Sequence, residues 1–272
     1  MSTRRLLADI GGTNARFALA DSASALAPDI MPVAQFDRFE DALEAFLAGH
    51  DVALDDIGSC AVAAAGPVSR GIVNLTNAPW TIDTSALAER LECPIRVLND
   101  LEAVACALPV LSDADLAVLR AGTPPSPMPM IAVNVGTGFG AAVAIPTRGE
   151  WNPLPTEPGH MSLHDGPGTV EDVLSGPGLA RLRKADPDGW RARFSTLLGR
   201  TTRDLVLATG TWGGVRFCGG VLDAWDEMID ERLFADAFDI DGPMAGRLAQ
   251  VPLARIVHPY PALVGLLNAR ID

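Results

Sequence analysis

The chain contains two copies of one hydrophobic pattern: a short apolar run, a glycine-rich turn and a second apolar run. Short apolar runs bounded by glycine are typical of buried strands. Two strand–turn–strand units in one chain indicate two related halves, each with its own hairpin. The predicted strands are Leu6–Ile10, Arg16–Ala20, Ile131–Val135 and Ala141–Ile145.

The rest of the chain mixes strand-like and helical patterns, which predicts the α/β fold class. Phe39, Leu43 and Phe46 fall on one face of a helix, and the polar residues at 83–85 supply N-cap chemistry for another. Further strands are expected over 57–65, 72–75, 95–98 and 215–218, and helices over 39–49, 84–91, 101–108, 221–237 and 262–269.

Composition narrows the function classes. The 272 residues suffice for one large domain or two of ordinary size, and 48% of them are hydrophobic. None of the apolar runs reaches the ~18 residues that a membrane span needs. The net charge of −13 argues against binding to nucleic acid or an anionic membrane. An anionic nucleotide would therefore be held by backbone amides, helix N-termini and a bridging Mg²⁺.

Cysteine usage and the N-terminus favour a cytoplasmic protein. Cys60, Cys93, Cys106 and Cys218 are scattered with no C-x-x-C pair, which favours buried thiols over a disulfide framework or a zinc site. The first residues contain no long apolar segment and no cleavage site of small residues, so we expect no signal peptide.

The two glycine turns are candidates for phosphate binding. A Rossmann fingerprint requires a helix after the turn, where strands are expected here, and a Walker A loop requires a lysine, whereas the chain's one lysine is Lys184. Two ordinary hairpins whose glycines supply positive φ are the alternative. Thr13 and Thr137 stand at matching places, and Asp9 beside the first turn offers a carboxylate to a metal, so we favour phosphate contact.

Asp100 is a candidate general base. It follows a predicted strand and begins a predicted helix, and α/β proteins place their ligands at the carboxyl ends of strands. The helix dipole favours its ionised form, which can accept a proton from a substrate hydroxyl. The alternative is that Asp100 or Asn99 only caps the helix.

The segment T-E-P-G-H is a candidate sugar loop, because Glu157 and His160 are close enough to bind adjacent hydroxyls of a polyol. With His164 they also have a metal-ligand spacing, which Pro158 disfavours by disrupting the helix that such a site needs. A solvated loop histidine is the third interpretation.

Two further positions carry open alternatives. Glu171 is either another polyol acceptor or an acid at a helix start. Gly219 and Gly220 either let a base or ribose approach the backbone or form a plain tight turn.

Taken in order, eight segments resemble the bacterial glucokinase family of the hexokinase–actin–heat-shock-chaperone superfamily. Each segment alone is a modest signal, whereas the ordered set spans nearly the whole chain. The segments are D-I-G-G-T-N-A-R-F-A-L (Asp9–Leu19), L-T-N-A-P-W (Leu75–Trp80), L-N-D-L-E-A-V-A (Leu98–Ala105), V-G-T-G-F-G (Val135–Gly140), T-E-P-G-H (Thr156–His160), E-D-V-L-S-G-P-G-L (Glu171–Leu179), T-W-G-G-V-R-F-C-G-G-V (Thr211–Val221) and V-H-P-Y-P-A-L-V-G (Val257–Gly265).

The resemblance implies two ribonuclease-H-like (actin-like ATPase) α/β domains with an active-site cleft between them. Residues 1–109 would form a small domain with the first phosphate loop and the catalytic aspartate. Residues 110–258 would form a large domain with the second phosphate loop, the sugar loop and the adenosine site. Residues 259–272 would form a helix that returns to the small domain.

The resemblance also implies ATP-dependent phosphorylation of glucose at its 6-hydroxyl, giving glucose 6-phosphate and ADP. Asp100 would be the general base, and Asp9 would organise Mg²⁺ through water. The implied glucose-binding residues are Asn99, Asp100, Glu157, His160 and Glu171, and the implied ATP-binding residues are Asp9, Gly11, Gly12, Thr13, Asn14, Gly136, Thr137, Gly138, Gly219 and Gly220.

Two stretches depart from the family pattern. Pro158 stands where the family usually has a second glycine, and proline fixes φ near about −65° and removes an N–H. The stretch from Leu179 to Gly210 is shorter than the family's usual segment, so helices of the large domain are expected to be trimmed.

Glucose and ATP are the expected partners, and neither nucleic acid nor a membrane is expected. A kinase for another hexose and a catalytically impaired sugar-binding or sugar-sensing homologue stay open as alternatives. A repressor would need a DNA-binding module, and Met1–Arg5 alone precede the first predicted strand. The oligomeric state, a homodimer included, is left open.

Overall fold

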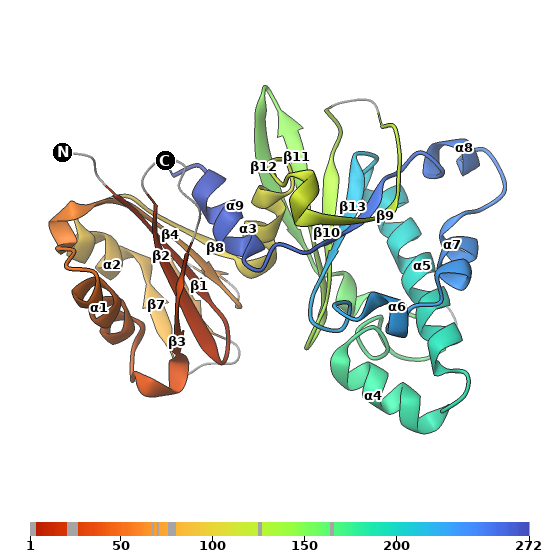
Figure 1. Ribbon diagram of the computed structural model, residues 1–272, viewed down its shortest axis with the longest axis horizontal. Coiled ribbons are helices and arrows are strands. Elements are labelled where there is room, and N and C mark those ends of the chain that lie inside the picture. Colours follow the sequence, from red (N-terminus) through yellow and green to blue (C-terminus); the bar gives the residue numbers. More distant parts are fainter. Residues whose placement is uncertain are drawn as a thin grey trace. The chain divides into compact units, whose positions relative to one another are not determined.

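The computed structural model describes residues 4–20, 27–66, 68–69, 71–75, 80–124, 127–163 and 166–271. The chain divides into two compact units (Figure 1). Unit 1 combines residues 1–107 with 260–272, and unit 2 comprises residues 108–259. Residues 76–79 of the L-T-N-A-P-W segment, and His164, lie outside the described residues.

Unit 1 is built on a five-stranded sheet with the order β3-β2-β1-β4-β8. The first three strands form an antiparallel meander, whereas β1, β4 and β8 run parallel. A separate three-stranded sheet has the order β5-β6-β7. The strands are β1 (Arg4–Ile10), β2 (Asn14–Ala20), β3 (Asp29–Pro32), β4 (Ile57–Ala64), β5 (Val68–Ser69), β6 (Ile72–Asn74), β7 (Thr81–Asp83) and β8 (Ile95–Asn99).

Helices cover both faces of the five-stranded sheet (Figure 1). Leu6, Ala8 and Ile10 of β1 lie in one core with α1 and α2, and strand alternation places Leu7 and Asp9 on the opposite face. On that face lie α3 and α9, which pack against each other although they are far apart in the sequence. The helices are α1 (Phe39–Gly49), α2 (Thr84–Leu91), α3 (Asp100–Ala107) and α9 (Pro261–Asn268), with short 3-10 turns at Val33–Gln35 and Leu54–Asp56.

Unit 2 has a similar strand arrangement, in a six-stranded sheet with the order β12-β11-β10-β13-β14-β9. Here β10, β11 and β12 form the antiparallel meander, β13 and β14 continue parallel to β10, and β9 adds an antiparallel edge. The strands are β9 (Leu116–Arg120), β10 (Met130–Val135), β11 (Phe139–Thr147), β12 (Glu150–Thr156), β13 (Gly214–Cys218) and β14 (Leu253–Ile256).

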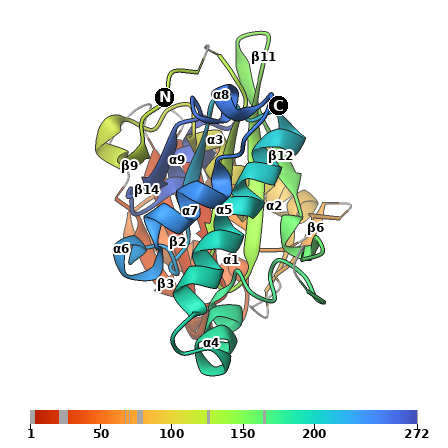
Figure 2. The same ribbon diagram turned by 90° about the vertical axis from the view of Figure 1, so that its right-hand side faces the viewer.

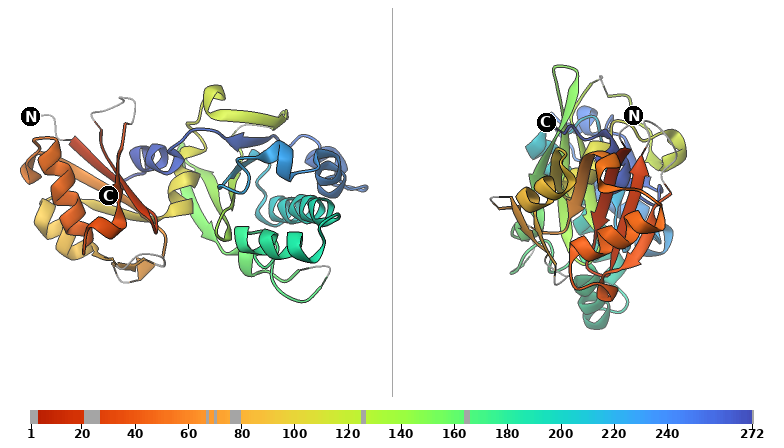
Figure 3. Two further views of the ribbon diagram at one scale, coloured as in Figure 1. Left: turned by 60° about the horizontal axis from the view of Figure 1, so that its bottom comes forward. Right: turned by 90° about the vertical axis from the view of Figure 1, so that its left-hand side faces the viewer.

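The long helix α5 packs against α7, and α4 lies near its N-terminal end (Figures 2 and 3). Its buried side chains, Phe194 and Leu198 among them, join the core of the six-stranded sheet. The helices are α4 (Gly176–Ala185), α5 (Trp190–Thr209), α6 (Trp225–Met228), α7 (Glu231–Phe238) and α8 (Ala245–Leu248), with 3-10 turns at Asp113–Asp115 and Pro158–His160.

The single helix predicted over 221–237 is wrong. The chain turns through residues 219–224 and then forms two short helices, α6 and α7, separated by an extended Ile229. The Asp230 carboxylate accepts from the Leu233 N–H and starts α7, while the Asp230 N–H donates to the Ser195 hydroxyl at 2.8 Å. A bond to α5 therefore replaces the intrahelical bond that would have continued α6.

No helix in the described part of the chain is both long and apolar enough to cross a membrane.

Candidate functional site

In unit 1, Asp9 and the first glycine turn lie together at the end of β1. The strand register sets Asp9 opposite Arg16, whose guanidinium donates to an Asp9 carboxylate oxygen at 3.1 Å. The Asp9 side chain is only 16% exposed. Burial raises the pKa of its carboxyl above the ordinary value, and Arg16 opposes that shift. A cation beside this carboxylate would stabilise its ionised form, so Asp9 fits the role of organising a metal.

The turn itself presents backbone rather than side chains. The Gly11 N–H donates to the Asn14 carbonyl at 3.0 Å, and Gly12 and Thr13 at the tip are exposed. Among the described glycines at positive φ, none belongs to either glycine turn. The hairpin alternative, in which these glycines supply left-handed backbone, therefore does not explain them.

Asn99 and Asp100 reach the same edge of the unit 1 sheet as this turn. Ile10 pairs with Ala64, and Ala64 pairs with Asn99, through the parallel strands β1, β4 and β8. Parallel neighbours lie about 4.8 Å apart, so the backbones at Ile10 and Asn99 are separated by roughly 10 Å. The sequence placed both Asp9 and Asp100 at strand ends, and the structure brings those ends to one edge.

The cap of α3 is formed mainly by Asn99. Its side-chain oxygen accepts from the Leu101 N–H at 2.9 Å, and the Glu102 carboxylate accepts from the Asn99 N–H at 2.9 Å. Asp100 also accepts from the Leu101 N–H, at 2.9 Å. Glu102 was not predicted as a capping residue, although its spacing from Asn99 is that of a capping box. The Leu101 N–H is thus shared between the side chains of Asn99 and Asp100, and Glu102 bonds the N–H that precedes the helix.

In unit 2, the second glycine turn and Gly219–Gly220 lie at one edge of the sheet, after the parallel strands β10 and β13. The Gly136 N–H donates to the Gly138 carbonyl at 2.9 Å, and Thr137 is exposed, like its counterpart Thr13. Gly219 has a φ of +99°, and a Cβ there would lie 2.5 Å from the Asn134 side-chain oxygen. Gly219 therefore lies against the end of β10, directly before the Gly136–Gly138 turn.

The sugar loop forms a 3-10 turn in which Pro158 and Gly159 are buried and Glu157 and His160 are exposed. Pro158 is its first residue, where its missing N–H costs no hydrogen bond, and its carbonyl accepts from the Met161 N–H at 3.1 Å. The proline is therefore compatible with a compact loop. The described residues contain no group of three metal-ligating side chains, and His164 of the alternative metal spacing falls outside them.

Glu171 lies against both the sugar loop and the second glycine turn. Its carboxylate accepts from the Phe139 N–H at 2.9 Å, and its own N–H donates to the Gly159 carbonyl at 3.0 Å. Glu171 is therefore not simply an acid at the start of α4, which is capped by Ser175.

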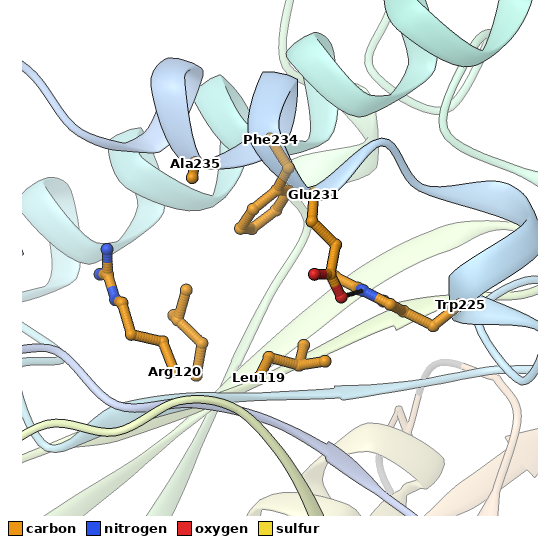
Figure 4. A pocket seen from close by; sticks show the side chains of 7 residues that line it. Leu119, Arg120, Trp225, Glu231, Phe234 and Ala235 are labelled. Carbon is orange, nitrogen blue, oxygen red and sulfur yellow. Dashed lines mark hydrogen bonds between the residues drawn. The ribbon is translucent and has the colours of Figure 1, made fainter.

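A small pocket in unit 2 contains none of the predicted site residues (Figure 4). It has a volume of about 180 Å³ and lies between the sheet edge and helices α6 and α7. The Trp225 indole N–H donates to Glu231 at 3.2 Å, and Arg120 is bound to Asp239 at 2.9 Å. It is lined by Leu119, Arg120, Trp225, Glu231, Phe234, Ala235 and Leu253.

All four cysteines are free thiols, with Cys60 and Cys93 buried and Cys106 and Cys218 partly buried. The prediction of buried thiols therefore holds for Cys60 and Cys93, whereas Cys106 and Cys218 are only partly buried.

Comparisons with known proteins agree over most of the chain. The family model described as Glucokinase matches residues 6–169 and 191–270. A glucokinase of Paramagnetospirillum magneticum is 31% identical over 100% of this chain and 99% of its own length. A glucokinase of Mesorhizobium japonicum is 31% identical over 96% of this chain and 89% of its own length.

Solved structures give the same result. A glucokinase from an Antarctic psychrotroph superposes with a TM-score of 0.87 at 28% identity, covering 98% of each chain. A glucokinase of the ROK family from Streptomyces griseus, solved with glucose and AMPPNP, shares the fold with a TM-score of 0.64 at 19% identity over 97% of each chain.

The alignment with the Paramagnetospirillum protein extends over 318 positions, more than the 272 residues of this chain. The relative therefore contains residues without a counterpart here, and the family match is interrupted over 170–190, where α4 lies. Since the family match and the relatives both extend over most of its length, the chain belongs to the glucokinase family.

Proposed function

We propose that this chain transfers the γ-phosphoryl group of ATP to the 6-hydroxyl of glucose, giving glucose 6-phosphate and ADP. The observation that carries the proposal is the shared sheet edge in unit 1, where Asp100 and the first glycine turn follow parallel strands in register. Phosphoryl transfer needs mainly positioning and charge neutralisation, together with one acceptor for the hydroxyl proton.

Asp100 is the proposed general base. It is the first residue of α3, so the positive end of the helix dipole favours its ionised form. Its carboxylate accepts from the Leu101 N–H at 2.9 Å, and its proposed role is to take the proton from the sugar 6-hydroxyl as that oxygen attacks phosphorus.

The sugar hydroxyls are proposed to bind Asn99, Asp100, Glu157, His160 and Glu171. Carboxylates accept hydrogen bonds from hydroxyls, and an imidazole can accept one or donate one. The exposure of Glu157 and His160 beside two buried loop residues supports this role, since their side chains are directed away from the core.

The two glycine turns are proposed to bind the ATP phosphates, and Gly219 with Gly220 to lie against adenosine. Bare N–H groups and the exposed hydroxyls of Thr13 and Thr137 are suitable donors to an anion. Asp9 would hold Mg²⁺ through water. When bound, Mg²⁺ neutralises phosphate charge as it develops in the transition state.

The fold supports a finer assignment, in which both units are ribonuclease-H-like domains because each sheet joins an antiparallel meander to parallel strands. We assign residues 1–109 to the small domain, 110–258 to the large domain and 259–272 to the returning helix. Four free thiols fit a reducing compartment such as the cytoplasm.

The test is a coupled assay of ADP release with glucose, mannose, fructose and N-acetylglucosamine. We expect glucose to give the highest kcat/KM. A higher value with another hexose would reassign the substrate. Glucose binding without turnover by any of the four sugars would favour the catalytically impaired sugar-binding alternative.

A further inference from the structure

The carboxylate of Glu171 makes a bond that its proposed sugar contact does not explain. One oxygen, Oε2, accepts from the backbone N–H of Phe139 at 2.9 Å. Phe139 is the first residue of β11 and directly follows Gly138 of the second glycine turn. A side chain proposed to bind sugar therefore also fixes the residue that ends the phosphate turn.

Two glycines leave room for this contact. A Cβ on Gly138 would lie 2.5 Å from Oε2 and 3.3 Å from the carboxyl carbon of Glu171. A Cβ on Gly159 of the sugar loop would meet the Phe139 carbonyl first and would lie 3.3 Å from the same oxygen of Glu171. Neither glycine is at positive φ, so close approach, rather than backbone conformation, accounts for both.

The backbone of Glu171 connects the same parts of unit 2. Its N–H donates to the Gly159 carbonyl at 3.0 Å, and its carbonyl accepts from the Ser175 hydroxyl, which also caps α4. The next residue, Gly176, donates its N–H to the Gly136 carbonyl at 2.7 Å. Sugar loop, phosphate turn and the start of α4 thus form one hydrogen-bonded cluster around Glu171.

We propose that Glu171 couples sugar binding to nucleotide binding: a hydroxyl bound at its second oxygen fixes the carboxylate, and the fixed carboxylate holds the Gly136–Gly138 turn in its phosphate-binding form. This inference rests on the sugar-binding role proposed above for Glu171. Oε1 has no hydrogen-bond partner among the described residues, so it is the oxygen left for the sugar. Glu171 acts on the phosphates as a positioning residue, since Phe139 and the turn lie between them.

Coupling of this kind is reciprocal and can be measured as a ratio of affinities. The dissociation constant of a non-hydrolysable ATP analogue is measured by calorimetry without sugar and with saturating glucose. In the wild-type protein we expect glucose to lower the dissociation constant of the analogue by on the order of 5-fold or more. In Glu171→Gln the amide oxygen can still accept from the Phe139 N–H, whereas an NH2 group replaces the oxygen proposed to accept the sugar hydroxyl. We therefore expect weaker glucose binding and, at saturating glucose, an analogue affinity that stays at its sugar-free value.

Glu157→Gln is the matched control, because Glu157 is the other glutamate proposed to bind sugar and makes no described side-chain bond to the turn. It is expected to weaken glucose binding while keeping the wild-type coupling ratio. If Glu171→Gln also keeps that ratio, Glu171 is a sugar ligand only and the inference is overturned. A wild-type ratio near 1 overturns it as well, whereas failure of the wild-type protein to bind glucose overturns the proposed function.

Hydrogen exchange at the Phe139 amide tests the same link without a variant. Glucose alone is expected to slow exchange of this amide at least several-fold, because its acceptor becomes fixed. Unchanged exchange with glucose demonstrably bound would contradict the proposal even if Glu171→Gln did not fold.

Discussion

A side chain on Gly265 of α9 would overlap the backbone carbonyl of Ala103 in α3. The two helices therefore meet backbone to backbone, and the C-terminal helix sets the position of the helix that begins with Asp100. The Arg5 guanidinium adds a bond to the carbonyl of Ala269, just beyond α9. A segment more than 150 residues away in the chain thus supports the proposed general base.

We expect Gly265→Ala to destabilise the protein by about 1–3 kcal/mol, the usual cost of overpacking a close contact. Chemical denaturation of the two proteins measures the difference. Gly246→Ala is the control, since Gly246 is exposed in α8 with nothing within 4 Å of a Cβ. It should leave stability unchanged or raise it slightly. Equal effects of the two substitutions would contradict a tight α3–α9 contact.

Asp100→Asn is expected to lower kcat by roughly 10²–10⁴, the usual contribution of a general base. Asparagine keeps an acceptor for the Leu101 N–H, so folding and glucose affinity should change little. The ADP-release assay and a glucose titration measure the two effects separately. Near-normal turnover would remove Asp100 from the role of base.

Asn99→Ala is expected to distinguish the capping role of Asn99 from the catalytic role proposed for Asp100 at the same end of α3. It removes the acceptor at 2.9 Å from the Leu101 N–H, so we expect a loss of about 1 kcal/mol in the free energy of unfolding. Because Asn99 is also a proposed sugar ligand, KM for glucose should rise while kcat falls far less than in Asp100→Asn. A fall in kcat equal to that of Asp100→Asn would contradict this division of roles.

The sequence predicted those elements whose signals are local. The helix over Phe39–Gly49 has the predicted bounds, because its apolar face and flanking residues are all contained in the segment. The break between α6 and α7 was not predicted, because it depends on Ser195 and on Arg191, which donates to the Asp226 and Ile229 carbonyls from α5. Bonds between distant segments leave no periodicity in the sequence.

In the candidate site, too, features with local sequence signals were predicted and contacts between distant segments were not. Residue types at strand ends indicated Asp9 and Asp100, and their strands do share an edge. The need for glycine at position 138 could not be predicted from the sequence. It arises because Glu171, more than 30 residues further along the chain, occupies the space that a side chain would fill. The pairing of Arg16 with Asp9 was likewise not predicted. Both residues lie in one hairpin, and the register of its two strands, which sets them opposite each other, could have predicted the pair.

Asp9→Asn is expected to raise KM for Mg-ATP by roughly 10–100-fold, the usual effect of changing a group that orients metal-bound water. Asparagine keeps an oxygen acceptor for Arg16 but loses the charge that attracts Mg²⁺. Titrations of Mg²⁺ at fixed ATP, and of glucose separately, measure both affinities. Equal losses for glucose and Mg-ATP would count against the metal role.

Alkaline pH is expected to destabilise the protein partly through Cys106. Burial, aided by the negative charge of Glu102, raises the pKa of this thiol from 9.0 to about 11. Between these values the unfolded chain has already released a proton that the native protein keeps, so the free energy of unfolding falls as pH rises. Cys106→Ala removes this contribution and should lose less stability between pH values of about 8 and 11 than the wild-type protein. Urea denaturation at both pH values measures it, and parallel losses in the two proteins would show that Cys106 does not titrate differently on folding.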